Sequence, residues 1–522
     1  MILETQTDTL SALSDPKTYG VKKVEIRQSH IAVLFLAGQK VYKLKRAVLY
    51  PEVDFSTPEK RRLACVQEMK RSAVYAPQLR LKIQSVRRLQ NGKIVIGGRS
   101  GAEIDTVLEM KRIPDKELLN RLLPSPRFDR FEIMNLAERI AQLHMTAKLC
   151  KNQWGVESIQ KIILENESVL SCFGEVFNKQ AVNALTQKNL AVLKEQSSLI
   201  SYRQKTGHVR KCHGDLLLSN IAWDKKDFIF FSPIEYNNAL SCVDTLYDIA
   251  DLMMDLEAKG LRRLTNMLFN HYMAYMNDMN GFPLLALYQS VRAASRAAVC
   301  IRKAALLKGL EKRQMRHNAR VYFELARHFM TPFKPILICC GGLSGSGKSR
   351  IAREIGGLMN PAPGAVILRD DIIKKQMVGL APHEPFDVRH DTTAFETVVY
   401  EALRQQAKTA ISNYSCVIID ALFIKESERA ETEKLAKAMG VPFVGIWAHA
   451  PMDIRNERIH KRRRNPSSIK GKQQLERQLK EQIGAVSWKK ISTDVSREQT
   501  LRRVVKLLKK QLKIVKRKMV LK

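Results

Sequence analysis

The sequence predicts two domains of different fold class: an α+β domain, followed by an α/β domain whose strands form a parallel sheet. In the first part, strand-like segments at residues 30–36 and 41–45 are joined by a short connection, which is typical of a β-hairpin. From Phe128 the pattern is mostly helical, apart from a loop-like section at 208–240. A small β-rich lobe therefore precedes a large α-rich lobe.

In the second part, apolar strand-length segments alternate with helical stretches, which favours parallel strands joined by helical crossovers. The expected strands are 335–340, 365–368, 415–420 and 442–448. Pro332 and Pro335 follow a long helical stretch and precede the first of these strands. We therefore expect one domain at residues 1–332 and a second at residues 333–522.

Length and composition are those of a multidomain protein. The 522 residues exceed what one hydrophobic core usually organises, and a hydrophobic content of 45% is ordinary for globular proteins. The longest apolar runs fall far short of the roughly 20 residues that cross a bilayer. The N-terminus lacks a basic-then-apolar signal pattern, so we expect a cytoplasmic protein. Nine scattered cysteines without a CxxC pair predict reduced thiols.

The charge is unusual, because 88 Lys and Arg residues face 52 Asp and Glu residues, for a formal net charge of +36. Such a field attracts nucleic acid, anionic membranes or phosphorylated ligands, although it is equally compatible with a role in solubility. No nucleic-acid-binding module is recognisable. Composition alone does not show which of these partners the protein binds, and it does not predict the oligomeric state.

Residues 342–349 carry the most informative motif, a GxxxxGK[S/T] phosphate-binding loop between a predicted strand and a predicted helix at 350–359. This context directs backbone N–H groups and a helix N-terminus at one point, which suits a polyphosphate. We expect Lys348 to reach the β- and γ-phosphates of ATP and Ser349 to bind Mg²⁺. The expected ATP-binding residues of the loop are Gly342, Ser344, Gly345, Ser346, Gly347, Lys348 and Ser349.

Two carboxylates are expected beside this loop. Asp420 follows the apolar residues 416–419 at the end of a predicted strand, where a P-loop kinase needs a ligand for Mg²⁺ or its water shell. Asp371 ends another strand and opens a helix, so its carboxylate would face the same cleft, and its resemblance to the corresponding Asp of small-molecule kinases implies that it contacts or deprotonates an acceptor hydroxyl. Alternatively, Asp370 or Asp371 merely caps the helix, and Asp370 is the better candidate for a cap.

A basic segment at residues 455–464 follows the last predicted strand. Kinases of this architecture carry an arginine-bearing lid here, which neutralises charge on the transferred phosphoryl group. Arg458 and Arg462 share a helix face and are the candidates for this role, although the segment could also be a solvated basic surface. The apolar stripe from Leu501 to Met519 is expected to pack on the domain, with an anionic lipid surface as the alternative.

A second phosphate site is predicted in the first part. Residues 213–220 read His-Gly-Asp-Leu-Leu-Leu-Ser-Asn, and the Asp-to-Asn spacing is that of a kinase catalytic loop. Asp215 would accept the proton of the attacking hydroxyl, and Asn220 would hold Mg²⁺. His213 would brace the loop.

Other kinase parts occur in the required order. Lys43 lies on a predicted strand and Glu68 in a helix, so the two could form the ATP-binding ion pair, with Lys45 on the same strand face competing for the role. Glu235 is the candidate for the metal-binding carboxylate. Asp244 and Asp248 could support the loop.

These motifs give the first part a resemblance to aminoglycoside-phosphotransferase-like kinase domains, which implies a protein-kinase-like α+β fold. The whole chain resembles the bacterial two-domain family of bifunctional aminoglycoside phosphotransferase/ATP-binding proteins, which implies an α/β P-loop kinase domain after it. The matching stretches are 41–46, 54–62, 213–216, 234–237, 255–258, the phosphate-binding loop, Asp371 with Lys374 and Lys375, and 417–421. Two positions depart from this family: Ser232 stands where it tends to have Asp, and Asp370 where it tends to have Ser.

The expected function is ATP-dependent transfer of the γ-phosphoryl group to a hydroxyl of a small molecule, with ATP and Mg²⁺ as cofactors. The P-loop domain would hold the principal ATP site, and the N-terminal kinase-like lobe a second site that is active or degenerate. Ser232 motivates the degenerate reading. The alternative is a nucleotide-dependent regulator or a nucleic-acid-binding ATPase, with a pseudokinase as its N-terminal lobe.

Overall fold

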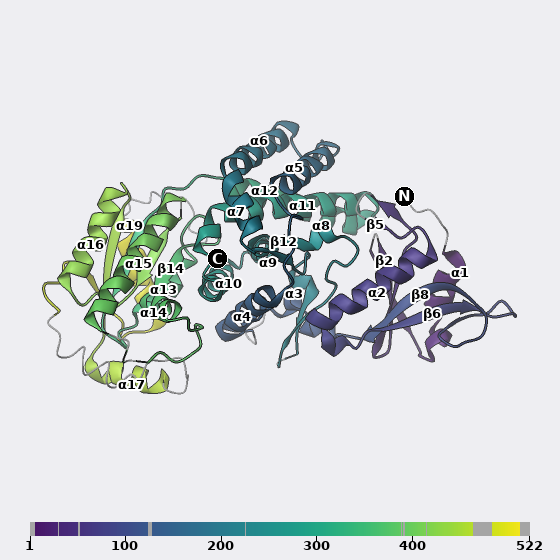
Figure 1. Cartoon of the computed structure of the whole chain (residues 1–522), viewed down its shortest axis with the longest axis horizontal. Coiled ribbons are helices and arrows are strands. Elements are labelled where there is room, and N and C mark those ends of the chain that lie inside the picture. The colour runs from purple at the N-terminus through teal and green to yellow at the C-terminus, as the bar shows by residue number, and fades with distance from the viewer. Residues whose placement is uncertain are drawn as a thin grey trace. The chain divides into compact units, whose positions relative to one another are not determined.

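The computed structural model describes residues 6–29, 31–50, 53–123, 128–224, 226–387, 389, 392–413, 415–462 and 483–511. Its chain forms two compact units (Figure 1). The first comprises Met1–Asp129, Gln142–Asp255 and Val291–Phe323, and the second comprises Arg130–Ala141, Leu256–Ser290 and Glu324–Lys522. Residues 256–290 thus pack within the second unit, and the domain boundary near residue 332 stays a prediction.

The first unit contains a six-stranded antiparallel sheet in the order β1-β2-β3-β8-β6-β7. Its strands are β1 (Val24–Gln28), β2 (Ala32–Ala37), β3 (Lys40–Lys45), β6 (Lys82–Arg88), β7 (Ile94–Ile96) and β8 (Ala102–Lys111). The predicted hairpin is the β2–β3 pair, in which Gly38 adopts a φ of 58° in the connecting turn. Phe35, Leu44, Val86 and Val107 form the core on one face of the sheet.

Helices make up most of the rest of the first unit. They are α1 (Thr7–Ser14), α2 (Pro58–Tyr75), α3 (Leu119–Leu122), α5 (Val156–Ser171), α6 (Lys179–Glu195), α7 (Ser197–Lys205) and α8 (Asn238–Ser241). Helix α2 begins with Pro58 after the capping residue Thr57, whose side chain accepts a hydrogen bond from the Lys60 N–H. Helix α2 packs on β8 and β6 of the sheet. Because a sheet and helices form separate regions of this unit, the α+β expectation is confirmed.

Within its described residues, the first unit also has three short strand pairs. They are β4 (Leu49–Tyr50) with β5 (Val53–Asp54), β9 (Val209–Lys211) with β12 (Cys242–Asp244), and β10 (Ile221–Trp223) with β11 (Phe228–Phe230). The last two pairs, β9–β12 and β10–β11, flank the candidate catalytic loop. Cys242 forms a disulfide with Cys150, so the expectation that all thiols are reduced is corrected. The strand pairing of Cys242 with Lys211, together with the hydrogen bond from the Cys150 N–H to the Val209 carbonyl, brings these two distant residues together.

Four helices are divided between the units: α4 (Arg130–Thr146), α9 (Thr245–Ala258), α11 (Leu285–Ala305) and α12 (Gly309–Phe329). The helices wholly within the second unit are α10 (Arg262–Met276), α13 (Lys348–Gly356), α14 (Asp370–Met377), α15 (Thr393–Ser412), α16 (Glu426–Ala438), α17 (Met452–Arg462) and α19 (Arg497–Gln511). Among the described residues, no helix combines the length and the apolar character that a membrane span requires.

The second unit is built on a five-stranded parallel sheet in the order β14-β15-β13-β16-β17. Its strands are β13 (Leu337–Gly341), β14 (Val366–Arg369), β15 (Val417–Asp420), β16 (Phe443–His449) and β17 (Lys489–Ser492). The expected α/β fold with a parallel sheet is therefore confirmed. Val504 and Leu508 of α19 join its core, so the C-terminal stripe packs on the unit, while Leu512, Val515 and Met519 lie outside the described residues.

Helix α10 covers the outer edge of this sheet, at β14. The Asn270 side chain accepts a hydrogen bond from the Ile367 N–H at 2.7 Å and donates one to the Ala365 carbonyl at 3.1 Å. Asn266, one turn earlier, donates to the same carbonyl at 2.9 Å. Two amide side chains thus satisfy backbone groups that an edge strand would otherwise leave exposed for pairing.

Candidate functional site

The phosphate-binding loop follows β13, the central strand of the parallel sheet. Gly342, Gly345 and Gly347 have φ values of 138°, 80° and 94°, which glycine adopts without strain. A Cβ atom at Gly342 would lie 2.4 Å from the Ala448 carbonyl oxygen, and one at Gly345 would lie 2.7 Å from that of Arg455. Helix α13 begins at Lys348, so the loop ends in a helix N-terminus. This geometry exposes backbone N–H groups to a polyphosphate.

Asp420 lies beside this loop at the carboxyl end of β15. Parallel pairing places Asp420 opposite Cys340 of β13, and the Gly342 N–H donates to the Leu422 carbonyl at 3.1 Å. Asp420 is buried, and within the described residues its Oδ1 has no hydrogen-bond partner. A buried carboxylate oxygen left without a partner is costly unless a cation or an ordered water meets it. Asp420 therefore fits a Mg²⁺ ion or its water shell, which also require oxygen ligands.

Ser346 gives a second sign that this site is shaped for a ligand. Its side chain is 1% exposed, and its Oγ also has no hydrogen-bond partner within the described part of the chain. The structure thus has unsatisfied polar atoms both on the loop and at the neighbouring strand end, as expected of a site completed by a bound nucleotide and its metal.

Asp370 and Asp371 open α14 at the end of β14. Asp371 pairs with Arg369 at 2.5 Å and remains about one-third exposed (34%), so its carboxylate is accessible. Burial raises the pKa of Asp371, but the Arg369 guanidinium and the Lys348 ammonium outweigh it and hold the pKa below its usual value. Asp371 is therefore ionised at neutral pH.

Asp370 has a different environment. One of its carboxylate oxygens accepts from the Asp371 N–H at 2.7 Å, and the other accepts from the Leu422 N–H at 3.2 Å. Asp370 is the first residue of α14 and Arg369 holds the cap position without a side-chain cap bond, so Asp370 satisfies backbone N–H groups at the start of α14 and after β15 without being the N-cap. Burial raises its pKa to about 6, against the opposing charge of Lys348.

The basic helix α17 lies directly against the phosphate-binding loop. Arg455 donates to the Ser344 carbonyl at 3.1 Å, and Arg458 donates to the Gly345 carbonyl at 3.2 Å. Arg458 also donates to the side chain and the carbonyl of Thr493, at 2.9 Å and 2.6 Å. In this structure Arg458 supports the loop by donating to the Gly345 carbonyl. The side chain of Arg462 lies outside the described residues.

In the first unit, β3, α2 and the segment that follows β11 bring together four charged side chains. Glu68 of α2 accepts from Lys43 at 2.7 Å and from Lys45 at 2.6 Å. Lys45 is fully buried and also pairs with Glu235. Burial raises the pKa of Glu68, but Lys43 and Lys45 together lower it to about 2. Burial and the nearby Glu68 raise the pKa of Glu235, although Lys45 opposes this shift.

The candidate catalytic loop is held by short hydrogen bonds. The Asn220 amide donates to the Asp215 carboxylate at 2.8 Å and to its carbonyl at 2.9 Å. The loop thus brings Asp215 and Asn220 together, as their spacing predicts. The buried His213 ring faces the Phe231 carbonyl at 3.2 Å, which ties the loop to the segment that leads to Glu235.

Asp248 supports this loop from α9. Its carboxylate accepts from the Gly214 N–H at 2.8 Å and the His213 N–H at 3.3 Å, and it meets the His144 ring at 3.2 Å. Burial raises the pKa of Asp248, but the His144 hydrogen bond and nearby cations lower it to about 2. His144, Cys212 and Asp248 lie close enough to hold a metal. The carboxylate already accepts two backbone N–H bonds, so these residues are better explained as loop support.

Ser232 has a left-handed backbone conformation, with a φ of 58°. Residues other than glycine, asparagine and aspartate rarely adopt this backbone conformation. The backbone at Ser232 is therefore strained. Its side chain is a hydroxyl, so this position supplies no carboxylate for a metal.

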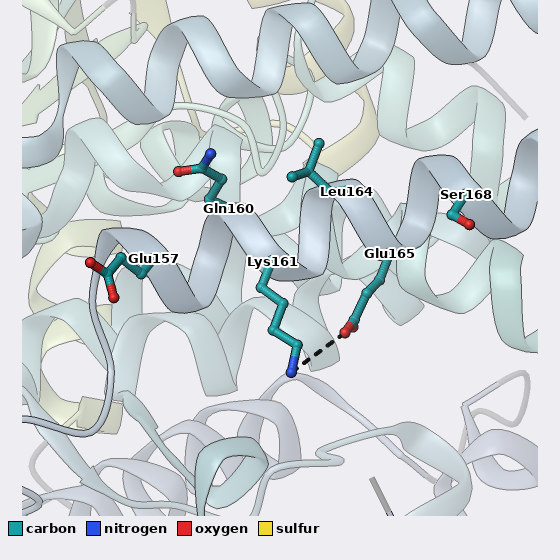
Figure 2. A pocket seen from close by; sticks show the side chains of 6 residues that line it. All are labelled: Glu157, Gln160, Lys161, Leu164, Glu165 and Ser168. Atoms are coloured by element: carbon teal, nitrogen blue, oxygen red, sulfur yellow. Dashed lines mark ion pairs between the residues drawn. The ribbon is translucent and has the colours of Figure 1, made fainter. Parts of the chain in front are cut away.

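Figure 2 shows a third region, an open hollow on one face of α5. Lys161 and Glu165 form an ion pair at 3.7 Å on this face, and both side chains are largely exposed. Its lining residues are Glu157, Gln160, Lys161, Leu164, Glu165 and Ser168, all from a single helix. Since no second element contributes a group, the hollow is a weaker candidate for a site than either phosphate loop.

Several residues of these sites escape sequence reasoning. Thr493 binds both Arg458 and the Ser346 carbonyl, the latter at 2.6 Å, yet it lies far along the chain in a segment without a motif. Asp255 accepts from the Leu218 N–H at 3.1 Å and from the Tyr322 hydroxyl at 2.9 Å. The available signals for Asp255 are the family resemblance of residues 255–258 and its place in a helix rich in apolar residues, where a buried carboxylate needs partners.

Comparisons with known proteins give a family match for one segment of the chain and relatives that match most of its length. Residues 337–484 match the AAA domain family. Uncharacterized proteins of Mycobacterium tuberculosis and Mycobacterium bovis are each 25% identical to the chain over 445 residues, which is 84% of this chain and 86% of theirs.

Two solved structures are similar to shares of the chain that differ in size. A choline/ethanolamine kinase family protein of Mesorhizobium loti is 13% identical with a TM-score of 0.37, and the match covers 62% of this chain and 92% of that one. The Mycobacterium tuberculosis APS kinase, solved with AMPPNP and APS, is 17% identical with a TM-score of 0.26, and the match covers 34% of this chain and 99% of that one.

The family match lies on the parallel sheet and its phosphate-binding loop, while the α+β unit carries the kinase-like loop and the Lys–Glu ion pairs. The chain thus combines an α+β unit that carries kinase-like motifs with a parallel-sheet unit that is similar to the AAA domain family over residues 337–484.

Proposed function

We propose that the protein is an ATP-dependent phosphotransferase, which transfers the γ-phosphoryl group of ATP to a hydroxyl of a small molecule at the P-loop site. The observation that carries this proposal is the convergence of three groups at one end of the parallel sheet. They are the phosphate-binding loop after β13, Asp420 with an unsatisfied oxygen after β15, and the accessible carboxylate of Asp371 after β14. In open α/β sheets, ligands bind at the carboxyl ends of the strands.

The loop residues bind the nucleotide. The backbone N–H groups of residues 342–349 surround the phosphates, and Lys348 neutralises charge on the β- and γ-phosphates. Ser349 and Asp420 would hold Mg²⁺, which would neutralise the charge that develops on the phosphates. Asp420 suits this role because its Oδ1 is buried without a partner among the described residues.

Asp371 acts on the acceptor. Its carboxylate is ionised at neutral pH and about one-third exposed, so it accepts the proton of the acceptor hydroxyl while that oxygen bonds to the γ-phosphorus. The bond between the γ-phosphorus and the bridging oxygen breaks, and ADP leaves. Arg369 keeps the carboxylate in place through its 2.5 Å ion pair.

The arginines of α17 complete the site. Arg455 and Arg458 hold the carbonyl side of the loop, which leaves the N–H side for phosphate. We assign Arg458 first to loop support and, with Arg462, to neutralisation of the transferred phosphoryl group when a nucleotide is bound.

The first unit supplies a second nucleotide site. Lys43 and Lys45 with Glu68 form the ATP-binding ion pairs, and Asp215 and Asn220 form the catalytic loop. The pairing of Glu235 with Lys45, together with Ser232, favours a site that binds nucleotide but transfers phosphoryl groups poorly. This observation is also what supports a regulatory ATPase with a pseudokinase lobe as the second candidate function.

Acceptor-dependent ADP release tests the proposal. Purified protein is incubated with ATP and Mg²⁺ and with sugars, aminoglycosides, nucleosides or oligonucleotides in turn. We expect ADP release to rise with at least one small hydroxyl compound and to disappear in Lys348→Ala. The matched control is Lys408→Ala, an exposed lysine of α15. Equal ADP release with every compound, or stimulation by oligonucleotides alone, would instead support the regulatory or nucleic-acid-binding ATPase.

A further inference from the structure

The turn between α11 and α12 presents two leucines to solvent. Leu306 is 78% exposed and Leu310 is 76% exposed, the two highest values among the large apolar side chains of the described residues. Single exposed apolar residues are common on protein surfaces. Two highly exposed leucines four positions apart in one tight turn are a different case, because together they present more apolar surface than a single residue does.

The hairpin packs through other residues. Ile301 and Ala304 of α11, and Ala319 and Phe323 of α12, are buried in the unit. Three residues connect the helices, and Gly309 starts α12 with a φ of 57°. This tight turn leaves Leu306 and Leu310 beyond the packed faces of the two helices, so their exposure follows from the geometry of the turn.

The same turn is strongly basic. Residues 302–313 contain one acidic residue, Glu311, and have a net charge of +4. The cationic residues are Arg302, Lys303, Lys308, Lys312 and Arg313. Among the described residues, none of these five side chains forms an ion pair, and four of the five are exposed. The positive charge is therefore not neutralised within the protein.

We propose that this turn, residues 302–313, is a docking surface for an anionic lipid bilayer. Leu306 and Leu310 enter the boundary between headgroups and acyl chains, while the lysine and arginine side chains extend to the lipid phosphates. Charge complementarity selects an anionic partner, and the protruding leucines favour lipid over nucleic acid, since a phosphate backbone gains little from aliphatic side chains. The inference does not depend on the proposed phosphotransfer, because neither phosphate loop contributes a residue to it.

Vesicle co-sedimentation tests this surface with the full-length protein. One set of vesicles is pure phosphatidylcholine, and the other also contains phosphatidylglycerol. We expect preferential binding to the anionic vesicles and a loss of about tenfold or more in L306S/L310S, since both leucines contribute buried apolar area. K303Q/K308Q should weaken binding to a smaller extent, and added salt should weaken the wild type.

The matched control is Leu63→Ser on α2, which alters a leucine that is also mostly exposed, at 58%. Because Leu306 and Leu310 make little contact with the core, both variants should keep the wild-type melting temperature. The proposal is overturned if anionic and neutral vesicles bind equally, or if L306S/L310S binds like the wild type. It is also overturned if L306S/L310S changes only the oligomeric state, or if an oligonucleotide binds at this turn while vesicles do not. ADP release is measured separately, so failure of one proposal leaves the other standing.

Discussion

Lys45 shows how much the kinase-like site depends on a single buried charge. It is fully buried and pairs with both Glu68 and Glu235, whereas Lys43 pairs with Glu68 alone and is 12% exposed. Removing one partner of a buried ion pair typically costs about 3–5 kcal/mol, because the other charge remains buried. We expect Lys45→Met to lower the free energy of unfolding by about that amount in urea titrations followed by circular dichroism.

Lys43→Met is the matched control for this prediction. Glu68 keeps Lys45 in that variant, so the loss of stability should be clearly smaller. Equal losses in the two variants would contradict the assignment of Lys45 as the central cation. The sequence places both lysines on one strand face, since residues two apart point the same way. Only the position of Glu235, 190 residues away, distinguishes them.

Asp370 predicts a pH dependence of stability at the P-loop site. Burial raises its pKa to about 6 in the folded protein, so the folded state binds more protons than the unfolded state between about pH 4 and pH 6. Stability contributed by this group therefore falls as the pH rises through that window. Relative to Asp370→Asn, which does not titrate, the wild type should lose about 1–3 kcal/mol of unfolding free energy from about pH 4 to pH 7.

The two proteins are compared by how steeply their free energy of unfolding changes with pH. Asp370→Asn also changes the hydrogen bond to the Leu422 N–H, but this adds a constant difference that does not affect the slope. Urea unfolding of both proteins at several pH values measures it. Parallel pH profiles for the two proteins would show that Asp370 has an ordinary pKa.

At the scale of elements, the phosphate-binding loop depends on its close contact with α17. Gly345 has a φ of 80°, and a Cβ atom there would lie 2.7 Å from the Arg455 carbonyl oxygen. We expect Gly345→Ala to displace the loop and to weaken ATP binding by at least about tenfold, since the N–H groups then miss the phosphates. Isothermal titration calorimetry with ATP measures this effect.

Gly379→Ala is a suitable control for the loop variant. Gly379 also has a positive φ, of 73°, but no atom lies within 4 Å of the Cβ position. Gly379→Ala therefore introduces a similar backbone strain but no close contact of the new Cβ atom with another residue. Equal ATP affinity in Gly345→Ala and the wild type would exclude a role for this contact in shaping the loop.

The contact between α10 and β14 is a second element-scale feature. Asn270 makes two hydrogen bonds to the edge of β14, and Asn266 makes one. Asn270→Leu removes both bonds and leaves the Ile367 N–H without its acceptor, whereas Asn266 still donates to the Ala365 carbonyl, so the free energy of unfolding should fall by about 1–3 kcal/mol. Asn280→Leu, at an exposed position outside α10, should have little effect in the same urea titration. A similar loss in both variants would argue against edge protection by α10.

The elements differ in how far the sequence predicts them. The β2–β3 hairpin and the strands of the parallel sheet follow from apolar runs, and the P-loop follows from its glycines and lysine. Each of these signals lies within a few neighbouring residues, so a short stretch of the sequence is enough to detect it. The position of α10 against β14 depends on hydrogen bonds between residues about 97 apart, such as Asn270 and Ile367, which no local pattern encodes.

At the scale of the whole molecule, one chain carries two phosphate loops on different folds. The sequence predicts both, because Asp215 and Lys348 each lie in a recognisable motif. It does not predict which carboxylates remain available for a metal. The structure engages Glu235 with Lys45 in the first unit, while Asp420 keeps an oxygen without a partner among the described residues of the second. This difference is the reason why we propose phosphoryl transfer at the P-loop site.

Direct detection of the product tests that assignment most directly. The protein is incubated with ATP, Mg²⁺ and the small hydroxyl compound that stimulates ADP release, and ³¹P nuclear magnetic resonance follows the phosphorus species. The account predicts a new phosphomonoester resonance in the wild type and in Asp215→Asn, and none in Lys348→Ala. A phosphomonoester that persists in Lys348→Ala but disappears in Asp215→Asn, or the formation of inorganic phosphate alone, would contradict it.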